Sequence, residues 1–288
     1  MTTALVLAGG GVTGIAWEIG VFTGLEEAGV PLAFDLVVGT SAGSVAGAQL
    51  LSGTPLPDLY ARQISDEHHE IAPLVALPEL VEKHPEFIQI ALNPSREVAV
   101  LLGGQAKDAK TPSLAVRRAS VAHRLTSEVW PDQPFLITTV DADNGDVVVL
   151  NRESGVDLVD AVTASCAIPL LWPPVELLGR TLIDGGARSP SHLDLASGHD
   201  VVLVFSPIIL AAAAGIQREA EQLRADGSRV VILAVDDEAF AAMGMNALDP
   251  TRRKPAAEHG RRQGLAFDRT LLGLAAERES GIARSGRV

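Results

Sequence analysis

The chain has 288 residues, of which 47% are hydrophobic and 20% are charged, a composition typical of globular proteins and not of disordered ones. Its net charge of −13 opposes binding to a nucleic-acid backbone or to anionic lipid through a polybasic patch. The single cysteine, Cys166, excludes an intrachain disulfide and a zinc site built from several cysteines.

The N-terminal part of the chain predicts two strand–helix units. An unbroken apolar run at residues 5–8 is typical of a strand buried on both faces of a parallel sheet, and a helix is predicted to follow as far as about Ala28. Residues 35–38 predict a second buried strand and residues 44–51 a second helix. This order is typical of an α/β fold with right-handed crossovers.

The remainder of the chain predicts helices first and further strands afterwards. Residues 56–128 predict several helices that prolines punctuate, with little strand signal. Strands are predicted at 135–140, 147–150, 181–183, 201–205 and 230–235, and helices at 158–165, 216–225 and 255–279. Because we find neither a repeat nor a linker, we predict one domain over residues 1–288. It is a three-layer α/β/α domain with a mostly parallel central sheet and a helical insertion near 56–128.

The sequence also bears on location. No apolar stretch reaches the roughly 18–20 residues that a spanning helix needs, and the first residues lack the basic start of a signal peptide. We therefore expect a soluble, cytoplasmic protein.

A serine lies at the centre of Gly39-Thr40-Ser41-Ala42-Gly43, between a predicted strand and a predicted helix. In such a G-x-S-x-G arrangement, a tight turn pushes the serine hydroxyl out above the edge of the sheet. Gly39 and Gly43 leave room for the turn, and the helix that follows directs free N–H groups at the same place. Ser41 is thus a candidate nucleophile; the alternative is a strand-to-helix turn with a serine or threonine cap.

Glycines also fill the turn after the first strand, in Gly9-Gly10-Gly11-Val12-Thr13-Gly14. Their N–H groups can form a nest for an anion, either the oxyanion of acyl transfer or a phosphate, since the run matches the dinucleotide pattern G-x-G-x-x-G. Dinucleotide binding requires an acid at the end of the second strand. Asp35 stands at the start of that strand, and Ser41 follows its end, so the pattern favours the oxyanion.

A third cluster, Asp184-Gly185-Gly186, follows the strand predicted at 181–183. Alone it is typical of an ordinary turn. All three clusters, however, follow predicted strands, and ligands of open α/β sheets bind at the carboxyl ends of strands. Together the clusters supply a candidate nucleophile, donors for an oxyanion and a carboxylate base.

These clusters, their order and the run Ala164-Ser165-Cys166-Ala167-Ile168-Pro169 resemble the patatin-like phospholipase family over about residues 4–205. The resemblance implies hydrolysis of fatty-acyl esters of lipids through a Ser–Asp dyad, with no metal and no organic cofactor. The sequence departs from the family at Thr13, where the family often has Arg or Lys. Carried over by position, the nucleophile is Ser41, its base is Asp184, the oxyanion-hole donors are Gly9, Gly10 and Gly11, and the supporting glycines are Gly14, Gly39, Gly43, Gly185 and Gly186.

Two other functions remain open. A Ser–His–Asp hydrolase would add His192 or His259, an order that suits the α/β-hydrolases, although their serine turn usually follows more strands than two. A non-catalytic module would instead bind a nucleotide at residues 9–14. Replacing the histidines separates triad from dyad, and a covalent adduct with a fluorophosphonate separates both from the binding module.

The expected partner is a lipid or acyl-ester substrate, and no nucleic acid. Apolar helices within residues 71–103 are candidates for the cover of an acyl pocket or for transient contact with a lipid surface, with core packing as the alternative. The sequence leaves the oligomeric state open.

Overall fold

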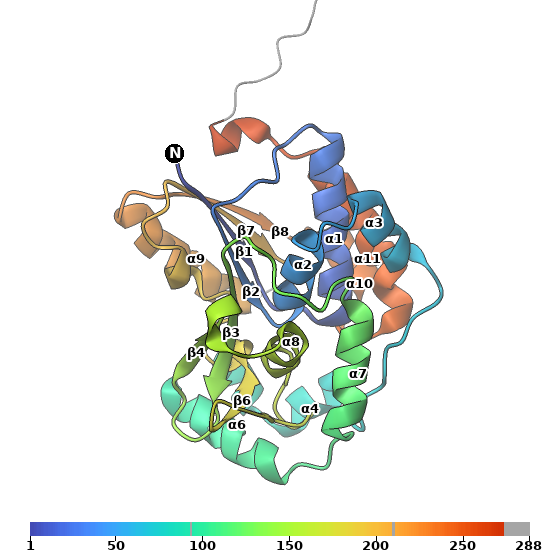
Figure 1. Cartoon of the computed structure of the whole chain (residues 1–288), viewed down its shortest axis with the longest axis vertical. Coiled ribbons are helices and arrows are strands. Elements are labelled where there is room, and N and C mark those ends of the chain that lie inside the picture. Colours follow the sequence, from blue (N-terminus) through green and yellow to red (C-terminus); the bar gives the residue numbers. More distant parts are fainter. Residues whose placement is uncertain (93, 209–210, 274–288) are drawn as a thin grey trace, which may run out of the picture.

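Eight strands form a central sheet in the part of the chain that the computed structural model describes, residues 1–92, 94–208 and 211–273 (Figure 1). Their order is β5-β6-β3-β2-β1-β7-β8, and β4 pairs with β3. The pairings among β1, β2, β3, β7 and β8 are parallel, whereas those of β4, β5 and β6 are antiparallel. The predicted, mostly parallel sheet is confirmed. The strands are β1 (Thr3–Leu7), β2 (Leu36–Thr40), β3 (Phe135–Asp141), β4 (Val147–Leu150), β5 (Val175–Leu177), β6 (Arg180–Asp184), β7 (Val201–Ser206) and β8 (Arg229–Ala234).

Helices cover both faces of this sheet, which confirms the three-layer arrangement. Leu5 and Leu7 of β1 belong to one hydrophobic core, and Ala4 and Val6 belong to the other, because alternate side chains of a strand point to opposite faces. The first core is covered by α1 (Gly11–Glu27), α2 (Ala42–Leu50), α8 (Leu158–Ser165), α10 (Asp237–Met243) and α11 (Arg253–Leu265), and the second by α9 (Ala211–Ala225). Figure 1 shows α9 on the opposite side of the sheet from α1 and α11.

The predicted helical insertion is confirmed between α2 and β3. It consists of α3 (Leu56–Ile64), α4 (Leu77–Lys83), α5 (Glu86–Leu92), α6 (Arg96–Asp108) and α7 (Leu114–Arg124). Serines begin two of these helices. The Ser95 hydroxyl accepts a hydrogen bond from the N–H of Val98 at the start of α6, and Ser113 accepts one from Val116 at the start of α7.

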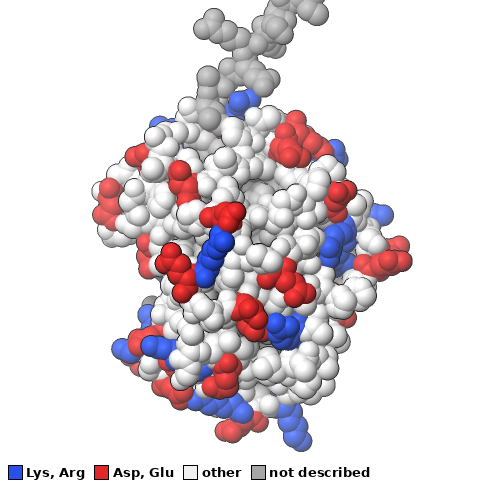
Figure 2. Space-filling model, in the orientation of Figure 1, with Lys and Arg blue, Asp and Glu red and all other residues white. Residues whose placement is uncertain are grey.

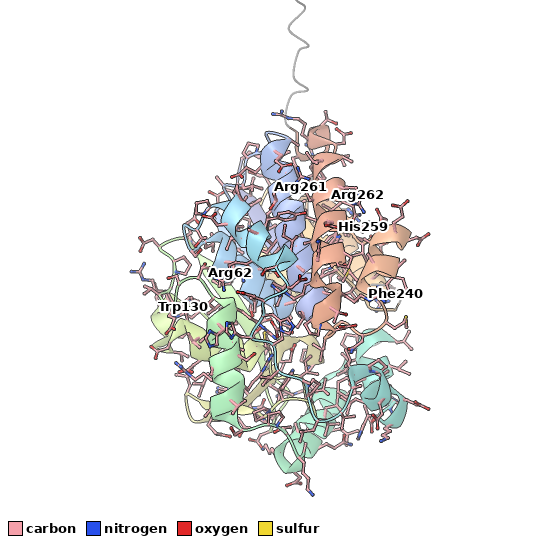
Figure 3. All side chains as sticks on the ribbon, turned by 90° about the vertical axis from the view of Figure 1, so that its right-hand side faces the viewer. Arg62, Trp130, Phe240, His259, Arg261 and Arg262 are labelled. Carbon is pink, nitrogen blue, oxygen red and sulfur yellow. The ribbon has the colours of Figure 1, made fainter. Side chains whose placement is uncertain are left out.

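The C-terminal helix is shorter than predicted. It was expected over 255–279, but α11 ends at Leu265 and a 3-10 turn follows at Arg269–Leu272; residues 274–279 lie outside the described part. Helix α11 packs closely against α1 (Figure 3). The close approach is possible because glycines of each helix face the backbone of the other helix. A Cβ at Gly20 of α1 would lie 2.1 Å from the Ala257 carbonyl oxygen, and one at Gly260 of α11 would lie 2.2 Å from that of Trp17.

The surface carries both signs of charge. Acidic and basic side chains are interspersed on the face shown in Figure 2, without a continuous basic stripe. Within the described ranges, no helix is both long enough and apolar enough to cross a bilayer.

Candidate active site

Ser41 occupies a sharp turn between β2 and α2. Its backbone has φ 53° and ψ −113°, an unusual conformation for a residue with a side chain, which costs about 1–3 kcal/mol. Three neighbours hold it: the Ser41 N–H donates to Ser165 Oγ at 2.9 Å, and its carbonyl accepts from Ser44 Oγ at 2.6 Å and from Cys166 Sγ at 3.3 Å. Hydrogen bonds to both the N–H and the carbonyl of Ser41 therefore hold the strained turn in place.

Two glycines make this turn sterically accessible. A Cβ at Gly43 would lie 2.1 Å from the Leu7 carbonyl oxygen of β1, and a Cβ at Gly39 would lie 2.7 Å from that of Gly43. Any side chain at either position would push α2 away from the sheet. The spacing of glycines around Ser41 thus reflects close backbone packing.

Strand β3 brings Asp184 beside the serine. Thr40, the last residue of β2, pairs with Thr138, and Asp184, the last residue of β6, pairs with the next residue, Thr139. The two strand ends therefore meet along β3. Both candidate side chains are nearly buried, with Ser41 7% and Asp184 5% exposed.

The two oxygens of the Asp184 carboxyl have different surroundings. Oδ1 accepts the Gly186 N–H at 2.7 Å, whereas the buried Oδ2 has no hydrogen-bond partner of full geometry in the described part of the chain. Burial raises the pKa of the carboxyl to about 6, against the opposing effects of the Ser41 hydroxyl, the Gly186 N–H and the Arg117 charge. The serine hydroxyl thus influences the carboxyl without a well-formed hydrogen bond, as is common in catalytic pairs before substrate binds.

The glycine-rich loop lies against the serine, since a Cβ at Gly9 would be 3.5 Å from Ser41 Cβ. The Gly9 N–H donates to the Pro190 carbonyl at 2.9 Å, so it is not free for an oxyanion as the sequence-based assignment supposed. The N–H groups of Gly10 and Gly11 donate to no acceptor within the described residues. Gly11 also begins α1 with φ 65°. Gly10 and Gly11 therefore remain the candidate donors.

An apolar pocket of about 450 Å³ opens beside these groups. Ser41, Asp184 and the three glycines form one part of its wall, and helices of the insertion form another through Leu77, Val81, Phe87 and Ile90. A separate polar pocket of about 250 Å³ contains neither Ser41 nor Asp184. Of these two pockets, the apolar one is therefore the one lined by both candidate residues. Its remaining lining residues are Ile168, Pro169, Gly186, Ala187, Pro190, Ile208, Ala247 and Leu248.

The alternatives from the sequence find little support in this geometry. His192 Nε2 is hydrogen-bonded to the Gly185 carbonyl at 2.9 Å, and neither His192 nor His259 lines the apolar pocket; Figure 3 places His259 on α11. Asp35 accepts the Thr3 N–H at the far end of β2, away from any ligand at residues 9–14. Within the described ranges, no three His, Cys, Asp or Glu side chains gather to hold a metal ion.

Sequence reasoning missed one residue of the site. Arg117 of α7 is 2% exposed, stacks on Trp172 at 4.0 Å and lies close enough to Asp184 to lower the pKa of that carboxyl. An arginine within an amphipathic helix has no local sequence signal that separates it from a solvated one.

The geometry defines an α/β protein with a serine on a strained strand-to-helix turn, a buried carboxyl and a glycine-rich loop at one pocket. The chain belongs to the patatin-like phospholipase family, whose model matches residues 5–197. This confirms the resemblance seen in the sequence.

Individual proteins match over more limited lengths. The chain is 44% identical over 61 residues to lysophospholipase nte1 of Aspergillus oryzae, and 28% identical over 196 residues to the uncharacterized protein YqhO of Bacillus subtilis. These matches span 21% and 64% of this chain, but 4% and 63% of those proteins. Two solved structures also match. VipD from Legionella pneumophila is 12% identical with a TM-score of 0.45, and the match covers 94% of this chain and 66% of VipD. The type III effector ExoU is 18% identical with a TM-score of 0.41, and the match covers 92% of this chain and 52% of ExoU.

Proposed function

We propose that the protein is a serine hydrolase that cleaves fatty-acyl ester bonds of lipids, with Ser41 as nucleophile and Asp184 as its base. The observation that carries this proposal is that a serine on a strained backbone and a buried carboxyl with an unpaired oxygen line the wall of one apolar pocket. A strained backbone and a buried carboxylate with one unpartnered oxygen both oppose folding. Their coincidence at a pocket is typical of a catalytic site.

In the first step, Ser41 Oγ attacks the ester carbonyl carbon and its proton passes to Asp184 Oδ2. The electron pair of the carbonyl moves to its oxygen, which the N–H groups of Gly10 and Gly11 stabilise. Collapse of this intermediate expels the alcohol, which takes the proton from Asp184. A water molecule then attacks the acyl-serine by the same route and releases the fatty acid. Each oxyanion donor typically contributes about 3–4 kcal/mol.

The environment of Asp184 suits the role of base. A carboxyl with the ordinary pKa of about 3.9 is a weak acceptor for a hydroxyl proton. Burial raises the pKa of Asp184 to about 6, which increases its basicity yet leaves most of it ionised at neutral pH. Near neutral pH, the carboxyl can therefore both accept the proton of the serine hydroxyl and release it again.

The pocket supports an acyl chain as the group that is bound. Leu77, Val81, Phe87 and Ile90 present apolar side chains to the space beside Ser41, and burying a methylene of a chain there stabilises binding by about 0.8 kcal/mol. Hydrolysis of a series of p-nitrophenyl esters tests this. The ratio kcat/KM should rise with acyl length until the pocket is filled.

The insertion also suggests how an aggregated substrate is reached. Leu74 and Ile88 are 64% and 48% exposed, next to segments that line the pocket. We include in the proposal that this apolar surface touches lipid transiently while the acyl chain enters the pocket.

The variants Ser41→Ala and Asp184→Asn test the proposed dyad. Turnover of p-nitrophenyl butyrate should fall to background in Ser41→Ala and by about 10²–10⁴-fold in Asp184→Asn, the range for loss of a general base. Ser197→Ala and Asp194→Asn, which change exposed residues of the same kinds, are the matched controls. Full turnover in either site variant would refute the dyad.

A further inference from the structure

Arg117 is a buried cation that the proposed dyad leaves without a role. It lies on α7 with 2% of its surface exposed, and its guanidinium stacks over the Trp172 ring at 4.0 Å. Its Nη2 donates to the Cys166 carbonyl at 3.5 Å, a long hydrogen bond, whereas Nε and Nη1 have no hydrogen-bond partner among the described residues. A buried charge with unused donors is unfavourable for folding. The unused donors therefore point to a ligand.

The space next to this guanidinium reaches the serine. A narrow cavity of about 10 Å³ is lined by Gly11, Ser41, Ala42, Arg117 and Trp172, among others. Gly11 and Ser41 line the apolar pocket as well. A cavity of that size holds a group no larger than about one water molecule. The cavity at Arg117 therefore has room for a single oxygen atom and not for a whole phosphate or carboxylate group.

Backbone contacts tie the cation to the serine turn. The Cys166 carbonyl accepts from Arg117, and the Cys166 thiol donates to the Ser41 carbonyl at 3.3 Å. One residue thus connects the guanidinium to the nucleophile. A change in the position of Arg117 would therefore shift the Ser41 backbone through the two hydrogen bonds of Cys166.

The charged neighbours of Arg117 leave it without a carboxylate of its own. Arg124, about two helical turns further along α7, is paired with Glu70 in a buried ion pair. Asp184 is the other acid that acts on Arg117, and its Oδ1 is bound to Gly186. Burial lowers the pKa of Arg117 to about 9, so the guanidinium still carries its charge at neutral pH.

We propose that Arg117 is a third oxyanion donor, which donates a charge-assisted hydrogen bond to the carbonyl oxygen of the ester as that oxygen becomes negative during attack by Ser41. The glycine loop itself supplies no cation, because residues 9–14 include no lysine or arginine and position 13 is a threonine, whose hydroxyl donates to the Ala247 carbonyl. The helical insertion, rather than the loop, then brings the positive charge to the reaction centre. Charge-assisted bonds are about twice as strong as neutral ones, and they strengthen as the oxyanion forms. This inference rests on the proposed ester hydrolysis.

The variant Arg117→Met separates a catalytic from a structural role, since methionine fills similar space without charge. We expect kcat on p-nitrophenyl butyrate to fall about 100-fold, the effect of losing one oxyanion donor, with KM within about threefold of the parent. Arg117→Lys, which keeps a charge, should recover part of kcat. Because the parent arginine carries unpaired buried donors, the thermal midpoint of Arg117→Met should not fall. Arg118→Met, the neighbour on α7 that pairs with Asp160 at the surface, is the matched control.

The pH profile gives a second readout. Arg117 faces Asp184, Arg124, Glu70 and the Cys166 thiol, and its charge lowers the pKa of Asp184. The midpoint of the acidic limb of kcat/KM should therefore move to higher pH in Arg117→Met.

Three results would overturn the inference. The first is a kcat in Arg117→Met within about threefold of the parent. The second is a loss of activity in Arg117→Met that accompanies a lower thermal midpoint or loss of the folded state, which would make the residue structural. The third is an unshifted acidic limb. Failure of the proposed function itself would look different: the parent protein would form no adduct with a fluorophosphonate at Ser41.

Discussion

Replacing the proposed base should make the protein more stable while strongly reducing its activity. In Asp184→Asn the amide oxygen still accepts the Gly186 N–H, but the buried charge is gone. Burial raises the pKa of the native carboxyl to about 6, against about 3.9 in an unfolded chain. The difference of about two pKa units corresponds to about 3 kcal/mol in the free energy of unfolding.

The sign of this effect depends on pH. Between about pH 4 and pH 6, the folded protein retains a proton that the unfolded chain has released, so the stability of the parent falls as pH rises through this window. Above about pH 6, the parent has lost the whole of this contribution to its free energy of unfolding. Asp184→Asn lacks this loss, so its advantage over the parent should be near zero at about pH 4 and reach about 3 kcal/mol above about pH 7.

Urea unfolding of the parent and of Asp184→Asn at both ends of that range measures the difference directly. Asp194→Asn, which removes an exposed acid nearby, controls for the change in net charge. A variant that is less stable than the parent at pH 8, or an advantage that does not change with pH, would refute the reasoning.

Three further predictions follow from the same geometry. The kcat/KM of the parent should rise with pH to a plateau with a midpoint near 6, set by the pKa of Asp184, and a pH-independent rate would contradict its role as base. Gly43→Ala should lower the free energy of unfolding by at least about 1–3 kcal/mol in urea unfolding, since its Cβ would lie 2.1 Å from a backbone oxygen of β1. Gly104→Ala is the control, because the new Cβ would have open space around it, and it should be neutral or slightly stabilising. The double variant Leu74→Ser with Ile88→Ser should reduce hydrolysis of phospholipid vesicles several-fold more than hydrolysis of soluble esters. Val129→Ser, at an exposed apolar residue outside the insertion, should change neither rate. Equal loss on both substrates would exclude the lipid contact.

The fold was predictable where local pattern and burial coincide. The run at residues 5–8 is apolar without alternation because β1 is covered on both faces, and Gly39 and Gly43 mark a turn that no larger residue would permit. The C-terminal helix was overestimated, because residues beyond Leu265 continue to favour a helix while the Asp268 side chain accepts the Thr270 N–H and begins a separate turn.

The site was predictable only in part, because its assembly depends on register and on distant segments. That Asp184 meets Ser41 follows from consecutive pairings along β3, which the sequence does not specify. The Gly9 N–H is used by Pro190, which lies far along the chain. Arg117 arrives from a helix whose surface pattern gives no sign that one of its arginines is buried.

The central claim is that Ser41 is a nucleophile activated by Asp184. Peptide mass spectrometry after treatment with an alkyl fluorophosphonate tests this claim most directly. We expect one adduct, on the peptide that contains Ser41, with labelling slowed about 10²-fold or more in Asp184→Asn. An adduct at another residue, or labelling of Ser41 at an unchanged rate without Asp184, would contradict it.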